Sequence, residues 1–193
     1  MSRSGSWRTV DIVVTAAIAV AFGVVFWAWN LLWDAASPVF VAVPPAQNVL
    51  YGTWLAAGVL GGLVVRKPGA ALFAELVAAS VSLILGSKWG LDAALSGLFQ
   101  GAGAELAFAL FLYRRWDLPV ALLAAALAAV GAWIHDTPIY YAELPLTDQL
   151  VIGAFMLVSA VIIAGIGSWW LLQALVQTGV LAQFPSGREQ QRI

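Results

Sequence analysis

The sequence predicts an all-helical, polytopic membrane protein built as a bundle of six transmembrane helices. Hydrophobic residues make up 62% of the 193 residues and charged residues only 10%, whereas soluble domains carry roughly 25% charged residues. The apolar residues fall into stretches of about 20, the length that crosses a bilayer as a helix. The basic residues lie between these stretches. Because every backbone amide in hydrocarbon needs an internal partner, helices are the architecture that fits.

Six apolar ranges define the predicted helices, and an irregular segment separates the first two. This segment, residues 34–46, contains Pro44 and Pro45, and proline cannot continue a helix. The turns at 66–69 and 114–119 are basic, and each carries a proline where the next helix begins. Such short joins predict antiparallel hairpins, so we expect the second helix beside the third and the fourth beside the fifth. The six ranges are 10–33, 47–65, 69–86, 90–112, 118–136 and 148–176.

The distribution of Lys and Arg predicts the orientation of the bundle, because cytoplasmic loops of membrane proteins carry an excess of both. With six crossings, eight of the nine basic residues fall on one side and Lys88 alone falls on the other. We therefore expect a multi-pass protein of the cell membrane, a single membrane domain over 1–193, with both termini in the cytoplasm. The eight residues are Arg3, Arg8, Arg66, Lys67, Arg114, Arg115, Arg188 and Arg192.

Composition also argues against several classes of function. The absence of cysteine excludes disulfides and thiolate catalysis. The single histidine, His135, cannot build a histidine metal site, and with Asp136 it is expected to form an interfacial polar pair. The scattered basic residues argue against a nucleic-acid partner. Since the sequence has no phosphate-binding loop and no hydrolase motif, we expect no enzyme, cofactor or metal, and ATP-driven work would need another chain.

Two of the ten acidic side chains lie well inside predicted helices, away from the helix ends, where each costs at least ~2.5 kcal/mol unless it is compensated. Glu75 lies eight residues beyond Lys67 and Glu105 nine residues before Arg114, so both are ~12 to 14 Å from the basic turns. Two acids at one depth predict a common interior. The alternatives are protonated structural acids that hydrogen-bond between helices, acids that face a cationic ligand, or an acid–base pair.

A second group of polar and aromatic side chains lies nearer the opposite ends of the helices, ~18 to 22 Å from the basic turns or beyond. Aromatic faces would sandwich a flat ring and attract a cation, and the amide of Gln100 would satisfy its polar edge. The alternative is that these Trp and Tyr side chains mark the membrane interface, where both are enriched. With Glu75 and Glu105, the predicted binding residues are Tyr51, Trp54, Trp89, Gln100, Trp133, Asp136 and Tyr140.

Three sequence segments are distinctive: Leu-Tyr-Gly-Thr-Trp at 50–54, Arg-Lys-Pro-Gly-Ala-Ala at 66–71, and Gly-Leu-Phe-Gln-Gly-Ala-Gly-Ala-Glu at 97–105. These segments resemble those of YkoE-type proteins. YkoE-type proteins are the substrate-binding (S) components of energy-coupling factor (ECF) transporters associated with thiamine or its hydroxymethylpyrimidine precursor. The resemblance implies a six-helix bundle that holds a vitamin near its outer face. It also implies work with a transmembrane coupling subunit and two cytoplasmic ATPases.

The resemblance further implies a role for the first helix. In related S components an Ala-x-x-x-Ala pattern on this helix meets the coupling subunit, and Ala17 and Ala21 match the pattern. The expected function is therefore import of thiamine or hydroxymethylpyrimidine across the lipid bilayer. The alternatives are an S component for another small vitamin, a proton-coupled carrier, or an intramembrane enzyme that uses Glu75 and Glu105.

Overall fold

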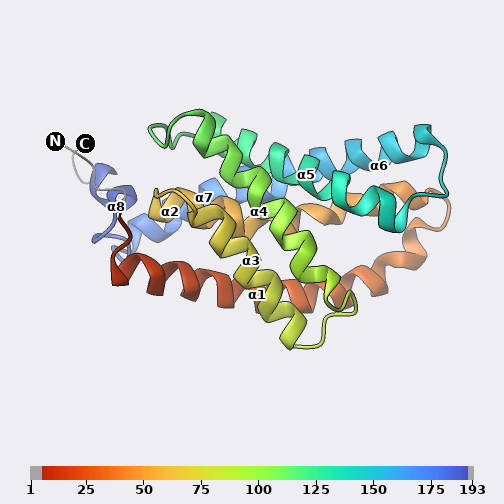
Figure 1. Cartoon of the computed structure of the whole chain (residues 1–193), viewed down its shortest axis with the longest axis horizontal. Coiled ribbons are helices and arrows are strands. Elements are labelled where there is room, and N and C mark those ends of the chain that lie inside the picture. The colour runs from red at the N-terminus through yellow and green to blue at the C-terminus, as the bar shows by residue number, and fades with distance from the viewer. Residues whose placement is uncertain (1–5, 191–193) are drawn as a thin grey trace.

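The computed structural model describes residues 6–190, with side chains for residues 6–188. All the regular structure in this range is helical, as the composition predicts. Figure 1 shows long helices packed side by side in an elongated bundle. The elements are α1 (Thr9–Ala36), η1 (Ser37–Phe40), η2 (Pro44–Leu55), α2 (Ala56–Val65), α3 (Ala70–Ile84), α4 (Asp92–Leu110), α5 (Leu118–Tyr140), α6 (Leu146–Ser159), η3 (Ala160–Ile166), α7 (Gly167–Gln177) and α8 (Pro185–Gln190).

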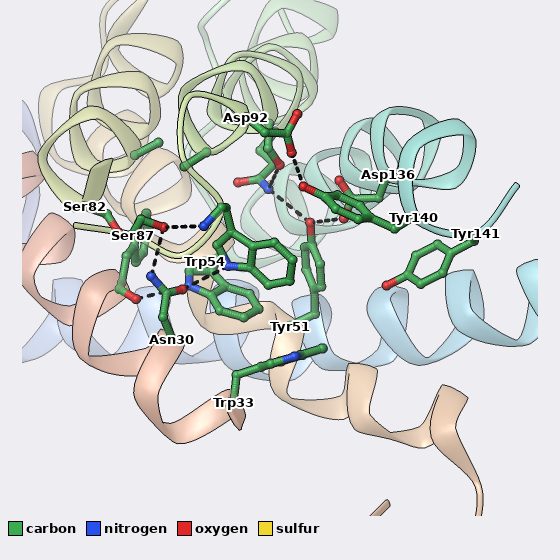
Figure 2. A pocket seen from close by; sticks show the side chains of 16 residues that line it. Asn30, Trp33, Tyr51, Trp54, Ser82, Ser87, Asp92, Asp136, Tyr140 and Tyr141 are labelled. Carbon is green, nitrogen blue, oxygen red and sulfur yellow. Dashed lines mark hydrogen bonds between the residues drawn. The ribbon is translucent and has the colours of Figure 1, made fainter. Parts of the chain in front are cut away.

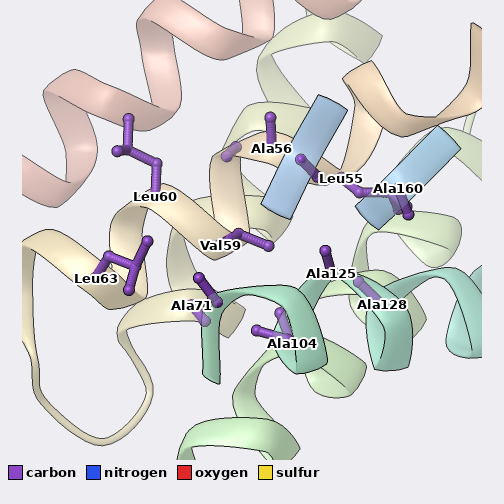
Figure 3. Close-up of a cluster of buried hydrophobic side chains, with 14 of the residues drawn as sticks. Leu55, Ala56, Val59, Leu60, Leu63, Ala71, Ala104, Ala125, Ala128 and Ala160 are labelled. Carbon is purple, nitrogen blue, oxygen red and sulfur yellow. The ribbon is translucent and has the colours of Figure 1, made fainter. Parts of the chain in front are cut away.

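The segment formed by the end of η2 and α2 is the centre of the bundle. Every residue from Tyr51 to Val65 is buried, and α2 packs against α1, α3, α4, α5, α7 and α8. Figure 3 shows Val59 and Leu63 of this segment among small side chains such as Ala71. A helix that is apolar on all sides is expected to be surrounded by other helices.

Small residues bring α4 and α5 into backbone contact. A Cβ atom added at Gly103 would lie 2.2 Å from the carbonyl oxygen of Leu127, and one at Gly131 would lie 2.4 Å from that of Phe99. Helices in lipid associate largely through such close van der Waals packing. The small residues therefore fix the separation of the two helices that carry much of the candidate site.

Both predicted hairpins are present, since α2 packs against α3 and α4 against α5. Within residues 6–190, five helical stretches are long and apolar enough to cross a membrane, while α3 is a shorter apolar helix. The last of the five joins α6, the π-helical segment η3 and α7 into one stretch, Leu146–Gln177. Six crossings remain a prediction.

The segment between the first two predicted helices is more ordered than its prolines suggest. α1 continues to Ala36, and a 3₁₀ helix, η2, begins at Pro44. A 3₁₀ helix has three residues per turn, so Asn48, Tyr51 and Trp54 lie in one row along η2. All three side chains are buried. The prolines start this helix and do not leave a loose loop.

The start of α1, the α2–α3 turn and α8 lie together at one end of the bundle (Figure 1). Trp7 Nε1 donates a hydrogen bond to the carbonyl oxygen of Pro68 at 3.0 Å, and Lys67 Nζ lies 2.8 Å from Asp11 Oδ2. Ser186 Oγ of α8 donates to the carbonyl oxygen of Val64 at 2.9 Å. The turn between α4 and α5 lies at the same end (Figure 1), so both basic turns are gathered there. Of the eight residues used to predict orientation, Arg3 and Arg192 lie outside the described range.

Candidate functional site

A cavity of about 270 Å³ lies toward the opposite end of the bundle, between α1, η2, α3, α4 and α5. Figure 2 shows its side chains converging from these elements. Among the residues that line it, none is Lys or Arg, and Asp92 and Asp136 carry its carboxylates. The lining consists of Phe26, Asn30, Trp33, Tyr51, Trp54, Ala79, Ser82, Ser87, Trp89, Asp92, Ala93, Ser96, Gln100, Asp136, Tyr140 and Tyr141.

Five aromatic rings form a continuous series along the cavity. The ring centroids of Trp33 and Trp54 are 5.1 Å apart, those of Tyr51 and Trp54 5.4 Å, and those of Trp54 and Trp89 6.3 Å. Trp89 continues to Tyr140 at 5.4 Å. Several pairs are edge-to-face, the geometry that aromatic quadrupoles favour. The result is an apolar, electron-rich wall for a flat ligand.

The polar side of the cavity is a network of hydrogen bonds around Asp136. Tyr51 Oη donates to Asp136 Oδ2 at 2.5 Å. Gln100 Nε2 donates to Tyr51 Oη at 3.3 Å and to Ser96 Oγ at 2.6 Å. Tyr51, Gln100 and Asp136 are each at most 6% exposed. The network orients a buried carboxylate toward the cavity.

A second carboxylate, that of Asp92, lies at the start of α4 and accepts a hydrogen bond from Tyr140 Oη. The neighbouring Tyr141 follows α5 directly, and burial, reinforced by the charge of Asp136, raises the pKa of its phenol to about 12. A phenol is protonated at neutral pH even with an ordinary pKa, so the Tyr141 hydroxyl can donate to a ligand.

The far corner of the cavity is fixed by Asn30 of α1. Asn30 Nδ2 donates to Ser87 Oγ at 3.1 Å, and its Oδ1 accepts from Trp89 Nε1 at 3.2 Å. Trp54 Nε1 donates to the carbonyl oxygen of Phe26 at 3.3 Å. The indole N–H groups of Trp54 and Trp89 both have partners, so these two rings are held in place before a ligand arrives.

Six of the nine binding residues predicted from sequence line this cavity: Tyr51, Trp54, Trp89, Gln100, Asp136 and Tyr140. Asp136 and Tyr140 lie on α5 and not beyond its end, because the helix runs on to Tyr140. Trp133 is not in the lining. Its Nε1 donates to the carbonyl oxygen of Gln149 at 2.9 Å, and its ring packs on Gly153, so it joins α5 to α6.

The two intramembrane acids do not meet in a common interior, and neither lines the cavity. Glu75 Oε2 accepts from the backbone N–H of Gly58 at 2.6 Å, which joins α3 to α2. Glu105 accepts from the backbone N–H groups of Gly69 at 2.6 Å, Ala71 at 2.9 Å and Leu72 at 3.2 Å. The first four backbone N–H groups of an α-helix have no partner within that helix. Glu105 thus supplies an acceptor for three backbone N–H groups at the start of α3. The prediction of a common level is wrong for the two carboxylates, because that of Glu105 lies at the basic turn itself, on Gly69, while that of Glu75 lies on Gly58.

Sequence reasoning missed several lining residues, Asn30, Trp33 and Asp92 among them. For Asn30 the sequence does carry a signal, because it belongs to a row of residues on α1 spaced three or four apart. The structure buries this row, which consists of Asp11, Thr15, Ala19, Gly23, Phe26 and Asn30. That spacing marks one face of a helix, and Trp33 follows three residues later. Asp92 gave no comparable signal, since an acid in the first turn of a helix is common.

Fold and cavity together define a membrane-embedded component with a small-molecule pocket at one end of a helical bundle. Residues 10–131 match the model of a family described as the permease component of an ABC-type cobalt transport system. The chain is 31% identical to the putative HMP/thiamine permease protein YkoE of Bacillus subtilis (strain 168), over 95% of this chain and 92% of that protein.

A comparison with solved structures also finds a transporter component. The crystal structure of an S component of an ECF transporter matches with a TM-score of 0.92 at 31% identity, over 97% of this chain and 94% of that chain. The chain therefore belongs to the YkoE family of ECF transporter S components, which confirms the resemblance drawn from its motifs. These relatives are transport components and not enzymes.

Proposed function

We propose that the chain binds thiamine or its hydroxymethylpyrimidine precursor in the aromatic cavity and delivers it for import by an ECF transporter. The observation that carries this proposal is the composition of the cavity lining. Five aromatic rings, from Trp33 to Tyr140, surround a space that also receives Asp92 and Asp136 and no Lys or Arg among its described residues. Aromatic faces and desolvated carboxylates both favour a flat cation.

Thiamine has the two features that this lining complements. Its thiazolium ring is a permanent cation, which Asp136 and Asp92 would compensate. Its aminopyrimidine is a flat ring with donors and acceptors, which would stack on Trp54 or Trp89 and pair with the amide of Gln100. The relative in Bacillus subtilis is named for the same two compounds, which supports this choice over another small vitamin.

The orientation follows from the charge distribution. Arg66, Lys67, Arg114 and Arg115 lie in turns at the end of the bundle remote from the cavity, and basic turns favour the cytoplasm. We infer that six crossings place both termini in the cytoplasm and that the cavity receives its ligand from outside.

Helix α1 supplies the surface for the coupling subunit. Ala17 and Ala21 are exposed on α1, next to exposed apolar side chains such as Val20 and Val24. The other small pair on this helix, Ala19 and Gly23, is buried, and a Cβ atom at Gly23 would lie 2.5 Å from Val81. Of the two pairs, only Ala17 and Ala21 are available to a coupling subunit, which would act with two cytoplasmic ATPases.

Binding to the purified protein in detergent tests the proposal, with tryptophan fluorescence as the signal. We expect thiamine or hydroxymethylpyrimidine to quench fluorescence with submicromolar affinity. Trp89→Phe, in the lining, should reduce the quenching. Trp170→Phe is the matched control, because Trp170 is 70% exposed and is not in the lining. Failure of both compounds to bind the wild-type protein would refute the proposed function.

A further inference from the structure

His135 lies directly behind the carboxylates of the cavity without lining it. Its side chain is 3% exposed, and its ring packs against Phe99 with centroids 5.2 Å apart. The ring therefore sits between α4 and α5, enclosed by protein. It is also the one histidine of the sequence, which has no cysteine.

Each ring nitrogen of His135 faces a different carboxylate. Nδ1 lies 2.8 Å from Asp136 Oδ1, at hydrogen-bond distance. Nε2 lies 3.3 Å from Asp92 Oδ1, although it is buried and has no partner with hydrogen-bond geometry. The histidine thus bridges the two acids that line the cavity, one on α4 and one on α5.

A neutral imidazole fits this arrangement poorly. Neutral histidine carries one N–H and one bare nitrogen, so in either tautomer a nitrogen without a proton lies within 3.3 Å of a carboxylate oxygen. When both nitrogens are protonated, the ring is a cation between two anions, and both contacts become electrostatically attractive.

We infer that His135, as an imidazolium between Asp92 and Asp136, sets the net charge of the cavity and thereby its preference for a cationic over a neutral ligand. This inference rests on the proposed function and deepens it. His135 is a positioning residue, since it acts on the ligand through the two carboxylates.

The titratable groups around the His135 ring determine how ligand binding should depend on pH. They are Asp92 from α4, Asp136 and Tyr140 from α5, and Tyr51 from η2, and the tyrosines donate to the acids. With the imidazolium present the cluster has one net negative charge, which a single cation neutralises. Loss of the proton leaves two negative charges. A bound cation therefore disfavours the protonated ring. Its binding releases a proton from His135, and its affinity rises with pH. A neutral ligand should release no proton, and its affinity should not depend on pH in this way.

Calorimetry of the purified wild-type protein with thiamine and with hydroxymethylpyrimidine tests the inference. Titrations between about pH 6.5 and 8, where histidine is the side chain with an ordinary pKa nearby, use two buffers of different ionisation enthalpy. We expect thiamine affinity to rise about tenfold across the range with release of up to one proton. The affinity for hydroxymethylpyrimidine should stay within about twofold, without release.

The variants His135→Gln and His135→Asn replace the ring N–H with an amide N–H donor but cannot carry the charge. In both, thiamine affinity should become independent of pH and proton release should vanish. Equal pH profiles for the two ligands in the wild-type protein would overturn the inference and leave the proposed function standing. No binding of either ligand would overturn both.

A second measurement does not depend on the variants folding. Nitrogen-15 labelling of histidine gives one imidazole signal, because the chain has one histidine. In the ligand-free protein near neutral pH both ring nitrogens should be protonated, and thiamine should lower the pH at which the proton is lost. A ring that is neutral in the ligand-free protein throughout this range would overturn the inference.

Discussion

Tyr51 and Asp136, 85 positions apart in the sequence, are joined by a hydrogen bond of 2.5 Å at the polar side of the cavity. The bond connects η2 to the last turns of α5, and Gln100 of α4 adds a third element by donating to the same hydroxyl. Three separate segments therefore position one buried carboxylate. We therefore expect the Tyr51 hydroxyl to contribute to ligand affinity.

Tyr51→Phe removes the hydroxyl and keeps the ring. Asp136 loses the donor on its Oδ2 and Gln100 loses an acceptor, so we expect thiamine affinity to fall about tenfold, which corresponds to about 1.4 kcal/mol. Tyr113→Phe is the matched control, because Tyr113 lies near Glu105 at the other end of the bundle, and it should leave affinity unchanged. Wild-type affinity in Tyr51→Phe would show that the network does not act on the ligand.

Glu105→Ala should affect stability and not binding. The carboxylate accepts three backbone hydrogen bonds at the start of α3, and loss of such a cap costs about 1–2 kcal/mol. We expect the thermal unfolding midpoint to fall by about 4 °C, with the dissociation constant for thiamine unchanged. Weaker binding at unchanged stability would place Glu105 on the ligand's path, as its depth alone suggested.

Gly131→Ala tests the close contact of α4 and α5. The added Cβ atom would lie 2.4 Å from the carbonyl oxygen of Phe99, which is backbone and cannot rotate away. Overpacking of this kind costs about 1–3 kcal/mol, so the yield of folded protein and the unfolding midpoint should fall. In the control Gly167→Ala the nearest contact is 3.9 Å, an ordinary distance, and stability should be retained. Equal unfolding midpoints for the two variants would contradict the close contact between α4 and α5.

The proposed orientation predicts which side of the membrane each loop occupies. The sequence has no cysteine, so single cysteines can be placed without background. Ala142→Cys lies in the loop after α5, beside the cavity, and Gln183→Cys lies before α8, and both positions are exposed. An impermeant maleimide should label Ala142→Cys in intact cells and Gln183→Cys only after permeabilisation. The reverse pattern would place the cavity on the cytoplasmic side.

The all-helical fold and the pairing of neighbouring helices could be predicted from the sequence, because hydropathy, proline position and charge are local signals. The chemistry of the cavity was predictable in part. Tyr51, Trp54, Gln100 and Asp136 combine the right depth with polar or aromatic character, and all four line the cavity.

What sequence reasoning could not supply was rotation about each helix axis. Glu75 and Glu105 were assigned to a ligand site by depth alone, yet they face backbone amides of neighbouring segments. Trp133 lies one helical turn from the lining residue Asp136 but faces α6. Contacts such as that between His135 and Asp92 join distant segments and depend on the crossing of α4 and α5, which follows from packing and not from local pattern.

The central claim is that the carboxylates of the aromatic cavity hold the cationic part of the ligand. Calorimetric titration of thiamine into the wild-type protein and into Asp136→Asn tests it most directly, because the substitution removes one charge and preserves the shape of the side chain. We predict a single site of submicromolar affinity in the wild-type protein and affinity at least about tenfold weaker in the variant. Equal affinity in a folded Asp136→Asn protein would contradict the account.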